Sequence, residues 1–469
     1  MPTAKRTYHT YEFITKQKAG LSMSKFLKNM KLTRILMLGY FTVILIGTIL
    51  LSMPFSSRNG EFTLVNESLF TATSATCVTG LVLSDVYTHW SIFGQLIILA
   101  MIQIGGVGFM TIAISALSCT KQKIGLKQRF TMQESVGAHQ IGGIVRMTRF
   151  ILTGSLIIEL SGAAILAIRF CPQFGAARGL YYSVFHSVSA FCNAGIDLMG
   201  RTSPGSSMIT VSGDILVNIV LMALIITGGL GFLVWDDLIR NKWHFRKYKL
   251  QTKVVITFSG ILLLIGAAGF MVMEYNSPSY AGMGFGEKLL ASFFQSASAR
   301  TAGFSSVDLS QMNESSQMLM TVLMFIGGAS GSTAGGIKIT TFAVLFISIL
   351  TAFRQRKALE CFRRRIDDSI LHNACCVMML YLTVSGISAI TISFIENIGI
   401  MPALFESVSA SATVGLSLGI TSSLSIPSQI ILILLMFMGR TGGLTILESF
   451  TNKISNINSQ YPSEKISVG

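Results

Sequence analysis

Charged residues are scarce in this chain of 469 residues. Asp, Glu, Lys and Arg together make up 12% of the sequence, whereas roughly 25% is usual in soluble domains. Hydrophobic residues make up 51%, and the mean hydropathy is +0.62. A soluble protein of this size needs more polar surface than these residues supply. The composition therefore indicates an integral membrane protein.

Motifs for metal binding and redox chemistry are also missing. The seven cysteines form no Cys-x-x-Cys pair, and the six histidines are scattered along the chain. Neither residue type has the spacing of a zinc site or of a disulfide framework. We therefore expect no covalently bound cofactor and no metal site beyond that of a transported ion.

Long apolar windows, in contrast, are abundant. A bilayer core of roughly 30 Å needs about 20 predominantly apolar residues in a helix. Eight windows meet this requirement, and we expect eight transmembrane helices. They are Ile35–Pro54, Ser91–Ser118, Phe150–Ile168, Ile215–Trp235, Val254–Met273, Gln317–Ala352, Ala374–Ile395 and Pro427–Leu447.

The distribution of the basic residues predicts how the chain lies in the membrane. The formal net charge of +15 could suggest nucleic-acid binding. However, 28 of the 36 Lys and Arg residues fall in the two termini and in the connections 119–149, 236–253 and 352–371, which eight spans place on one side. Only six fall on the other side. This bias follows the positive-inside rule and predicts a multi-pass plasma-membrane protein with both termini cytoplasmic, lipid contacts and no nucleic acid.

One short motif occurs four times. Each copy reads Phe-x-(Ser or Ala)-x-Ser-Ala and ends a few residues later in a glycine, and these glycines are 115, 108 and 112 residues apart. The copies are Phe70–Gly80, Phe185–Gly195, Phe294–Gly303 and Phe405–Gly415. Each apolar run is too short to cross a membrane, so it suits a re-entrant half-helix followed by a loop that is buried or lines water.

The repeats predict an all-α integral membrane protein. We expect four pseudo-symmetric span–pore helix–span repeats around a central pore. The predicted segments are a cytoplasmic basic N-terminal segment at 1–33, repeats at 34–118, 148–238, 253–352 and 371–450, and a cytoplasmic tail at 451–469.

The loop that ends each motif is a candidate selectivity filter. An ion crossing a membrane exchanges its water for fixed oxygens, and rings of backbone carbonyls can supply them. Glycine allows the tight backbone that such a ring needs, and the half-helices would direct their negative C-terminal dipoles at a cation. The predicted filter residues are Thr76, Cys77, Val78, Thr79, Gly80, Cys192, Asn193, Ala194, Gly195, Arg300, Thr301, Ala302, Gly303, Ala412, Thr413, Val414 and Gly415. Asp85, Asp197 and Asp308 follow these loops and either concentrate cations at an outer mouth or are ordinary solvated charges.

The second spans contain a further repeated motif. A glycine pair occurs in each of the first three copies, and in the first two close helix packing accounts for it. In the third copy, residues 327–336 consist only of Gly, Ala, Ser and Thr in the middle of an apolar window, which predicts a broken helix with a loop at mid-membrane depth. In the fourth copy Arg440 takes the place of a glycine, and a charge within the membrane indicates a functional residue.

Together these motifs resemble the Trk/Ktr/HKT superfamily of potassium transporters, and most of all the membrane subunits of bacterial Ktr systems. The resemblance covers residues 30–450. It rests on Ala75–Leu81, Phe191–Gly195, Ala299–Phe304, Ala412–Leu416 and Gly331–Lys338. It implies one glycine per filter loop and potassium as the main ion, with sodium as an activator in some members of this branch. The loops lack the longer filter signature of true potassium channels, so we expect a more modest selectivity.

The resemblance also implies a gate and partners. The glycine-rich loop would lie under the filter and face Arg440, and it would obstruct ions there. The predicted gate residues are Gly327, Gly328, Ser330, Gly331, Ser332, Thr333, Gly335, Gly336, Lys338 and Arg440. Ktr-type subunits form homodimers on a cytosolic ring of nucleotide-binding regulatory subunits. Because no nucleotide-binding domain follows residue 451, we expect nucleotides to act only through such a partner.

Two other kinds of function remain as alternatives. A sodium/potassium carrier that works by alternating access is also built from repeats and broken helices, although usually from two repeats. A remote alternative is an intramembrane hydrolase in which Lys338 would activate Ser330 or Ser332. The glycine-rich loop offers no defined pattern of oxyanion donors, so we do not expect an enzyme.

Overall fold

The computed structural model describes residues 32–108, 144–203, 205–242, 244–356 and 358–443, and residues 111, 130 and 133. The predicted tail at 451–469, nearly all of the N-terminal segment and most of 109–118 and 444–450 lie outside these residues. The expected all-α fold is confirmed: within the described ranges the only sheet is a hairpin of β1 (Glu360–Cys361) and β2 (Arg364–Arg365), and helices form the rest of the framework.

Four long helices open the four repeats. They are α2 (Leu32–Ser52), α8 (Ile144–Phe174), α12 (Leu250–Glu274) and α16 (Asp368–Glu396). Each is long and apolar enough to cross a membrane. Their outer sides are apolar, as shown by Val272 and Phe394, which are 79% and 86% exposed. Large apolar side chains in such numbers on an outer surface are stable in lipid and not in water.

A shorter helix follows each long helix and packs against it. These pore helices are α3 (Val65–Cys77), α9 (Ala176–Cys192), α13 (Phe285–Ser298) and α17 (Ile400–Ser411). At 1.5 Å per residue, none reaches the roughly 30 Å of a bilayer core. The phenylalanine that opens each sequence motif is completely buried in all four: Phe70, Phe185, Phe294 and Phe405.

After the pore helix, a further helix completes each repeat but ends early. We call it the second helix, because it is the second membrane-crossing helix that the sequence predicts for the repeat. These second helices are α5 (Ile92–Val107), α10 (Ile215–Leu230), α14 (Glu314–Phe325) and α18 (Ile426–Thr441). The predicted span Ile215–Trp235 is divided between two helices. Gly231, with φ +91°, ends α10, and α11 (Phe232–Asn241) leaves at an angle of 96°. In the window 317–352 the helix stops at Phe325 and resumes only with α15 (Ile339–Phe353).

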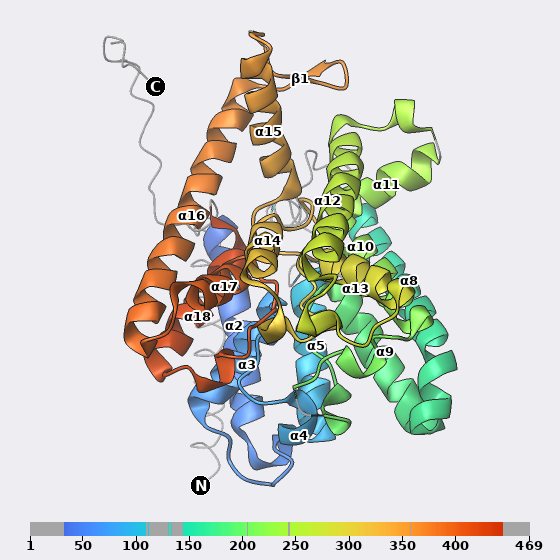
Figure 1. The fold of residues 1–469 in the computed structure, drawn as a ribbon, viewed down its shortest axis with the longest axis vertical. Helices are drawn as coiled ribbons and strands as arrows, with labels where there is room; N and C mark the ends of the chain where they lie inside the picture. Colours follow the sequence, from blue (N-terminus) through green and yellow to red (C-terminus); the bar gives the residue numbers. More distant parts are fainter. Residues whose placement is uncertain are drawn as a thin grey trace, which may run out of the picture.

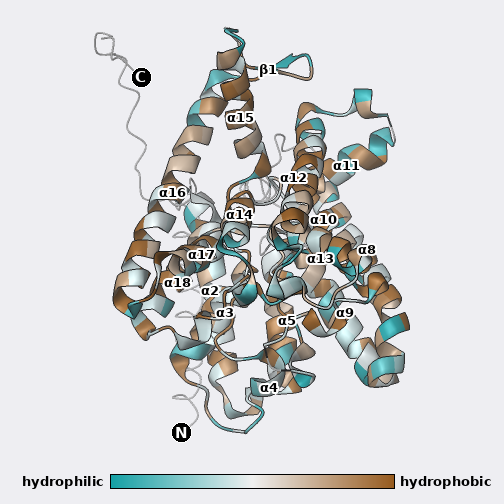
Figure 2. Cartoon of the chain, in the orientation of Figure 1, coloured by the Kyte–Doolittle hydropathy of each residue, from teal (hydrophilic) through white to brown (hydrophobic). Residues whose placement is uncertain are grey.

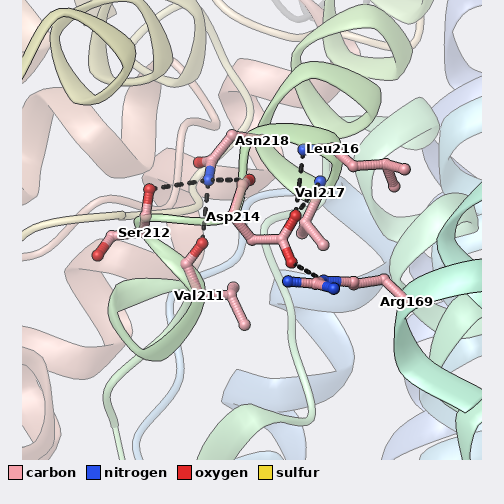
Figure 3. Close-up of polar contacts among 7 residues, drawn as sticks. All are labelled: Arg169, Val211, Ser212, Asp214, Leu216, Val217 and Asn218. Atoms are coloured by element: carbon pink, nitrogen blue, oxygen red, sulfur yellow. Dashed lines mark hydrogen bonds and ion pairs between the residues drawn. The ribbon is translucent and has the colours of Figure 1, made fainter. Parts of the chain in front are cut away.

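Polar side chains fix the N-terminus of α10. At the start of α10, the Asp214 carboxylate accepts hydrogen bonds from the backbone N–H groups of Leu216 (3.1 Å) and Val217 (3.2 Å) and pairs with Arg169 of α8 (Figure 3). The Asn218 amide donates to three carbonyls of the preceding turn, at 2.8–3.0 Å. This capping satisfies the free N–H groups of the helix and joins it to the long helix of its own repeat.

Hydrophilic segments lie at the two ends of the molecule (Figures 1 and 2). The short helix α4 (Val86–His89) marks one end, and the β1–β2 hairpin and the connection after α11 mark the other. The second end carries the basic residues Arg240, Lys242, Arg246, Lys247, Lys249, Arg363, Arg364 and Arg365.

Candidate functional site

The four pore helices end in the same way. Two residues before the motif glycine, the backbone turns into the left-handed region at Val78, Asn193, Thr301 and Thr413, with φ between 51° and 87°. The chain then leaves the helix in each repeat. The helix C-termini, with their partial negative charge, therefore lie next to the predicted filter segments.

The four motif glycines form a closed ring. Each has φ between 66° and 100°, and a Cβ atom built on any of them would lie 2.0–2.5 Å from the carbonyl oxygen that precedes the glycine of another repeat. The pairs are Gly80 with Ala194, Gly195 with Ala302, Gly303 with Val414, and Gly415 with Thr79. This cyclic order places repeats 1 and 3, and likewise repeats 2 and 4, across the ring from each other. Because a real Cβ never approaches an oxygen so closely, only glycine fits at these positions.

A serine at the fifth position of each motif holds its filter segment in place. The Ser74 and Ser409 hydroxyls each accept a hydrogen bond from the N–H of their own motif glycine, both at 3.0 Å. The Ser189 and Ser298 hydroxyls instead donate to the carbonyl that follows the glycine. All four motif copies have a serine at this position. This repetition could have indicated that the serine holds the filter segment, but the role was not predicted.

The residue after each motif phenylalanine ties down the segment beyond the filter in three repeats. His186 Nε2 accepts from the N–H of Leu198 at 3.3 Å, and the Gln295 amide donates to Ser305 Oγ at 3.2 Å. The buried Glu406 carboxylate accepts from the Thr421 hydroxyl at 3.1 Å. The sequence analysis missed these residues too.

A cavity of about 410 Å³ opens on one side of the ring. All four motif glycines and the three predicted mouth residues, Asp85, Asp197 and Asp308, line it. Asp85 and Asp308 also cap short helices. Burial, reinforced by the nearby Asp85, raises the pKa of Asp197 to about 6. The cavity therefore gathers carboxylates above the ring, where they attract cations.

The remaining predicted filter residues differ in what their side chains do. Arg300 directs its guanidinium away to α12, where it donates to Ser259 O (3.1 Å) and Ser259 Oγ (3.0 Å), so only its backbone can contribute to the ring. Thr76, Thr79, Thr301 and Thr413 have buried hydroxyls without a partner in the described part of the chain. The other side chains of the segments are buried in the wall, and they are Cys77, Val78, Cys192, Asn193, Ala194, Ala302, Ala412 and Val414.

The segment between α14 and α15 forms a closed loop. Its two ends are joined by hydrogen bonds from Gly327 N to Ile337 O (2.8 Å) and from Ile339 N to Gly328 O (3.0 Å). Inside the loop, Lys338 Nζ donates to Ala334 O at 2.8 Å, and Ser332 Oγ donates to Ala329 O at 2.6 Å. At the tip, the carbonyl of Gly331 accepts from Phe232 N at 2.8 Å. We call residues 326–338 the intramembrane loop.

The intramembrane loop contacts two filter segments that face each other across the ring. On the side of repeat 2, Thr333 Oγ1 donates to Phe191 O at 3.1 Å. On the side of repeat 4, Gly335 and Gly336 pack so closely that their Cβ atoms would lie 2.0 Å from Thr413 Oγ1 and 2.9 Å from Ala412 O. The loop therefore extends from one side of the ring to the other.

Arg440 connects the intramembrane loop to repeat 1. Its guanidinium donates to the Thr333 carbonyl and to the carbonyls of Gly105 and Gly106 at the end of α5, the last at 3.0 Å. Arg440 belongs to repeat 4, which lies between repeats 3 and 1 in the ring, so its guanidinium ties the loop of repeat 3 to the second helix of repeat 1. Among the ion pairs of the described ranges, none involves Arg440. Its positive charge therefore has no carboxylate partner among the described residues.

The chain is similar to known cation transport proteins. The chain matches the model of the TrkH family, described as a cation transport protein, over residues 33–460. It is 39% identical over 454 residues to the Ktr system potassium uptake protein B of Bacillus subtilis, covering 96% of this chain and 100% of that protein. It is 37% identical over 448 residues to the potassium/sodium uptake protein NtpJ of Enterococcus hirae, covering 94% and 98%. The crystal structure of the potassium transporter TrkH from Vibrio parahaemolyticus has a similar fold, with a TM-score of 0.68, 15% identity, and 88% and 84% coverage.

Proposed function

Because this chain belongs to the TrkH family of cation transport proteins, we propose that it is the potassium-translocating membrane subunit of a Ktr-type uptake system. Membership of a transport family also confirms the expectation that it is not an enzyme. The observation that carries the proposal is the closed ring of Gly80, Gly195, Gly303 and Gly415, in which each glycine packs against a backbone carbonyl of the next repeat, between an acidic cavity and the intramembrane loop.

Permeation through the ring is channel-like in this proposal. Four carbonyls around one axis replace the hydration shell of a potassium ion, and the pore-helix C-termini stabilise its charge. Asp85, Asp197 and Asp308 raise the local cation concentration at the mouth. With one ring glycine per loop, selectivity over sodium is moderate, and sodium stimulates uptake.

The intramembrane loop is the gate. It extends across the ring on the side away from the cavity, and Arg440 holds it to the opposite repeat. A glycine-rich backbone without helical hydrogen bonds has alternative conformations at small energetic cost. Movement of the loop, together with release of Arg440 from Thr333, opens the path.

The cytoplasmic end of the molecule carries the β1–β2 hairpin and the basic connection after α11, in line with the positive-inside rule. Two copies of the chain form a homodimer, and a cytosolic ring of nucleotide-binding subunits docks at this end and controls the gate. In mild detergent the purified protein is expected to have the mass of two protomers and to recruit that ring. A monomeric mass, with full regulated transport by this chain alone, would contradict this assembly.

Potassium flux into liposomes that contain the purified chain tests the proposal against a carrier. At a fixed membrane potential, a pore is expected to give unidirectional tracer rates that continue to rise with potassium concentration and are not accelerated by potassium on the far side. A carrier that works by alternating access saturates and is accelerated by potassium on the far side. Absence of any potassium flux from well-folded protein would overturn the proposed function.

A further inference from the structure

Thr333 connects the intramembrane loop directly to one filter segment. Its side chain is completely buried, and its hydroxyl donates to Phe191 O at 3.1 Å. The Asn193 amide lies 3.3 Å from the same hydroxyl. Phe191 and Asn193 belong to the turn that leads into Gly195, so a single hydroxyl of the loop contacts two residues of the second filter segment.

Two further elements fix the position of this hydroxyl. Thr333 N donates to Gly228 O of α10 at 3.3 Å, and Thr333 O accepts from Arg440 of α18. Gly228 also makes room for the contact: a Cβ there would lie 2.0 Å from Phe191 O and 2.9 Å from Thr333 Oγ1. The loop, the second helix and the filter segment therefore meet without space between them, and the hydroxyl cannot move while the loop stays in place.

The contact is specific to repeat 2. The carbonyls of Thr76 and Ser411 occupy the position of Phe191 O in repeats 1 and 4, and each lies 2.0–2.2 Å from the Cβ position of a glycine on its own second helix, Gly105 or Gly439. Within the part of the chain that the structure describes, no side chain donates a hydrogen bond to either carbonyl, in contrast to Phe191 O. The loop thus donates a side-chain hydrogen bond to the filter segment of repeat 2, whereas it meets the segment of repeat 4 through the close packing of Gly335 and Gly336.

We propose that Thr333 is a positioning residue that couples the intramembrane loop to ion occupancy of the filter. While the loop is in place, its hydroxyl holds the Phe191–Asn193 turn in the geometry that completes the ring. When the loop leaves, this hydrogen bond is lost and the second segment relaxes. Coupling between two sites is reciprocal, so potassium in the ring stabilises the loop in its closed position. This inference rests on the proposed function of the ring and the loop.

Hydrogen exchange at the backbone of residues 326–337, followed by mass spectrometry on the full chain in lipid nanodiscs, tests this coupling. We expect potassium, compared with choline at equal ionic strength, to slow exchange in this segment about fivefold, at the lower end of typical coupling strengths. Thr333→Ser retains the hydroxyl and is expected to retain the slowing. Thr333→Val has nearly the same volume but no hydroxyl, and is expected to lose it.

The melting temperature in the potassium and choline buffers distinguishes failure of the Thr333 coupling from failure of the proposed filter. If potassium raises the melting temperature of the parent protein but leaves loop exchange unchanged, the coupling is refuted and the filter stands. Equal slowing in Thr333→Val and in the parent would also refute it. If potassium changes neither quantity in the parent, the proposed filter itself fails.

Discussion

The second helices of repeats 2 and 3 both end close to their glycine pair, but the chain continues differently. α10 ends at Gly231, and α11 begins immediately at an angle of 96°. α14 ends at Phe325, and the whole intramembrane loop precedes α15. The two breaks touch, since Ala329 N donates to Gly229 O at 2.9 Å. One repeat thus uses the break to redirect a helix, whereas the other uses it to insert a loop beneath the ring.

This difference separates what the repeats share from what only one copy has. The shared features, a pore helix, its serine and its glycine, build a ring that needs four similar parts. Within the described part of the chain, a loop of this kind occurs in repeat 3 alone, and only the fourth copy of the glycine motif carries an arginine, Arg440. A barrier on the axis needs one element that crosses it, so we expect changes in shared features to alter selectivity and changes in unique features to alter rate.

Arg440→Ala is expected to give the largest effect. The substitution removes hydrogen bonds from a charged group, each of which typically contributes about 1.5–3 kcal/mol, and removes the positive charge beside the ion path. Because about 1.4 kcal/mol corresponds to a factor of ten, we expect at least a roughly tenfold higher initial rate of potassium uptake without the regulatory partner. Arg58→Ala, at an exposed position, is the matched control and should leave the rate unchanged. A well-folded Arg440→Ala protein with the parent's rate would remove Arg440 from the gate.

Gly80→Ser tests the shared ring. The new Cβ would lie 2.4 Å from Ala194 O, so one of the four carbonyls must move. We expect the preference for potassium over sodium to fall about tenfold, equivalent to about 1.4 kcal/mol, in competition uptake assays. Gly60→Ser is the control, because Gly60 also has positive φ, at 72°, but has no atom within 4 Å of its Cβ position. Unchanged apparent affinities for both ions in Gly80→Ser would show that this loop is not part of the filter.

Asp197 is expected to give the smallest effect, as a dependence on external pH. Its pKa is raised from 3.8 to about 6, so it takes up a proton as the pH falls through 6, before the same group does in the unfolded chain. Acidification from 6 towards 4 therefore favours the folded state through this group, while the cavity loses a negative charge. We expect the apparent potassium affinity to fall about twofold between pH 7.5 and 5.5, as befits one screened charge.

Two substitutions test whether Asp197 causes this pH dependence. Asp197→Asn should have the lower affinity at both pH values, and Asp308→Asn should retain the pH dependence of the parent. If uptake by Asp197→Asn depends on pH as in the parent, another group is responsible.

Local pattern predicted much of the architecture. Apolar windows and the repeated motif indicated an all-α membrane fold with four repeats, and the motif glycines do lie around one axis. These features depend on composition and spacing within short segments, which the sequence displays directly. The bend at Gly231 was missed because an apolar window does not reveal whether a glycine inside it adopts a positive φ.

Contacts between distant residues could not be predicted in the same way. Thr333 and Phe191 are 142 positions apart, and Arg440 and Gly105 are 335 apart. Nothing in the sequence around these residues shows that they meet, because their approach depends on how four repeats close around the axis. Arg300 is a further example: the motif places its backbone in the predicted filter, but nothing near it in the sequence shows that its guanidinium donates to Ser259 of α12.

We expect the intramembrane loop, held in place by Arg440, to limit potassium flux below the ring. Because Gly327 and Ile337 are already hydrogen-bonded at 2.8 Å, residues 330–334 can be removed without pulling the helices apart. The decisive measurement is the initial rate of potassium uptake by this shortened protein and by the parent, each with and without the regulatory subunit, in liposomes containing equal amounts of protein of equal melting temperature. We predict a higher rate for the shortened protein that no longer responds to the regulatory subunit. A normally folded shortened protein that transports potassium no faster than the parent would show that the loop does not limit flux.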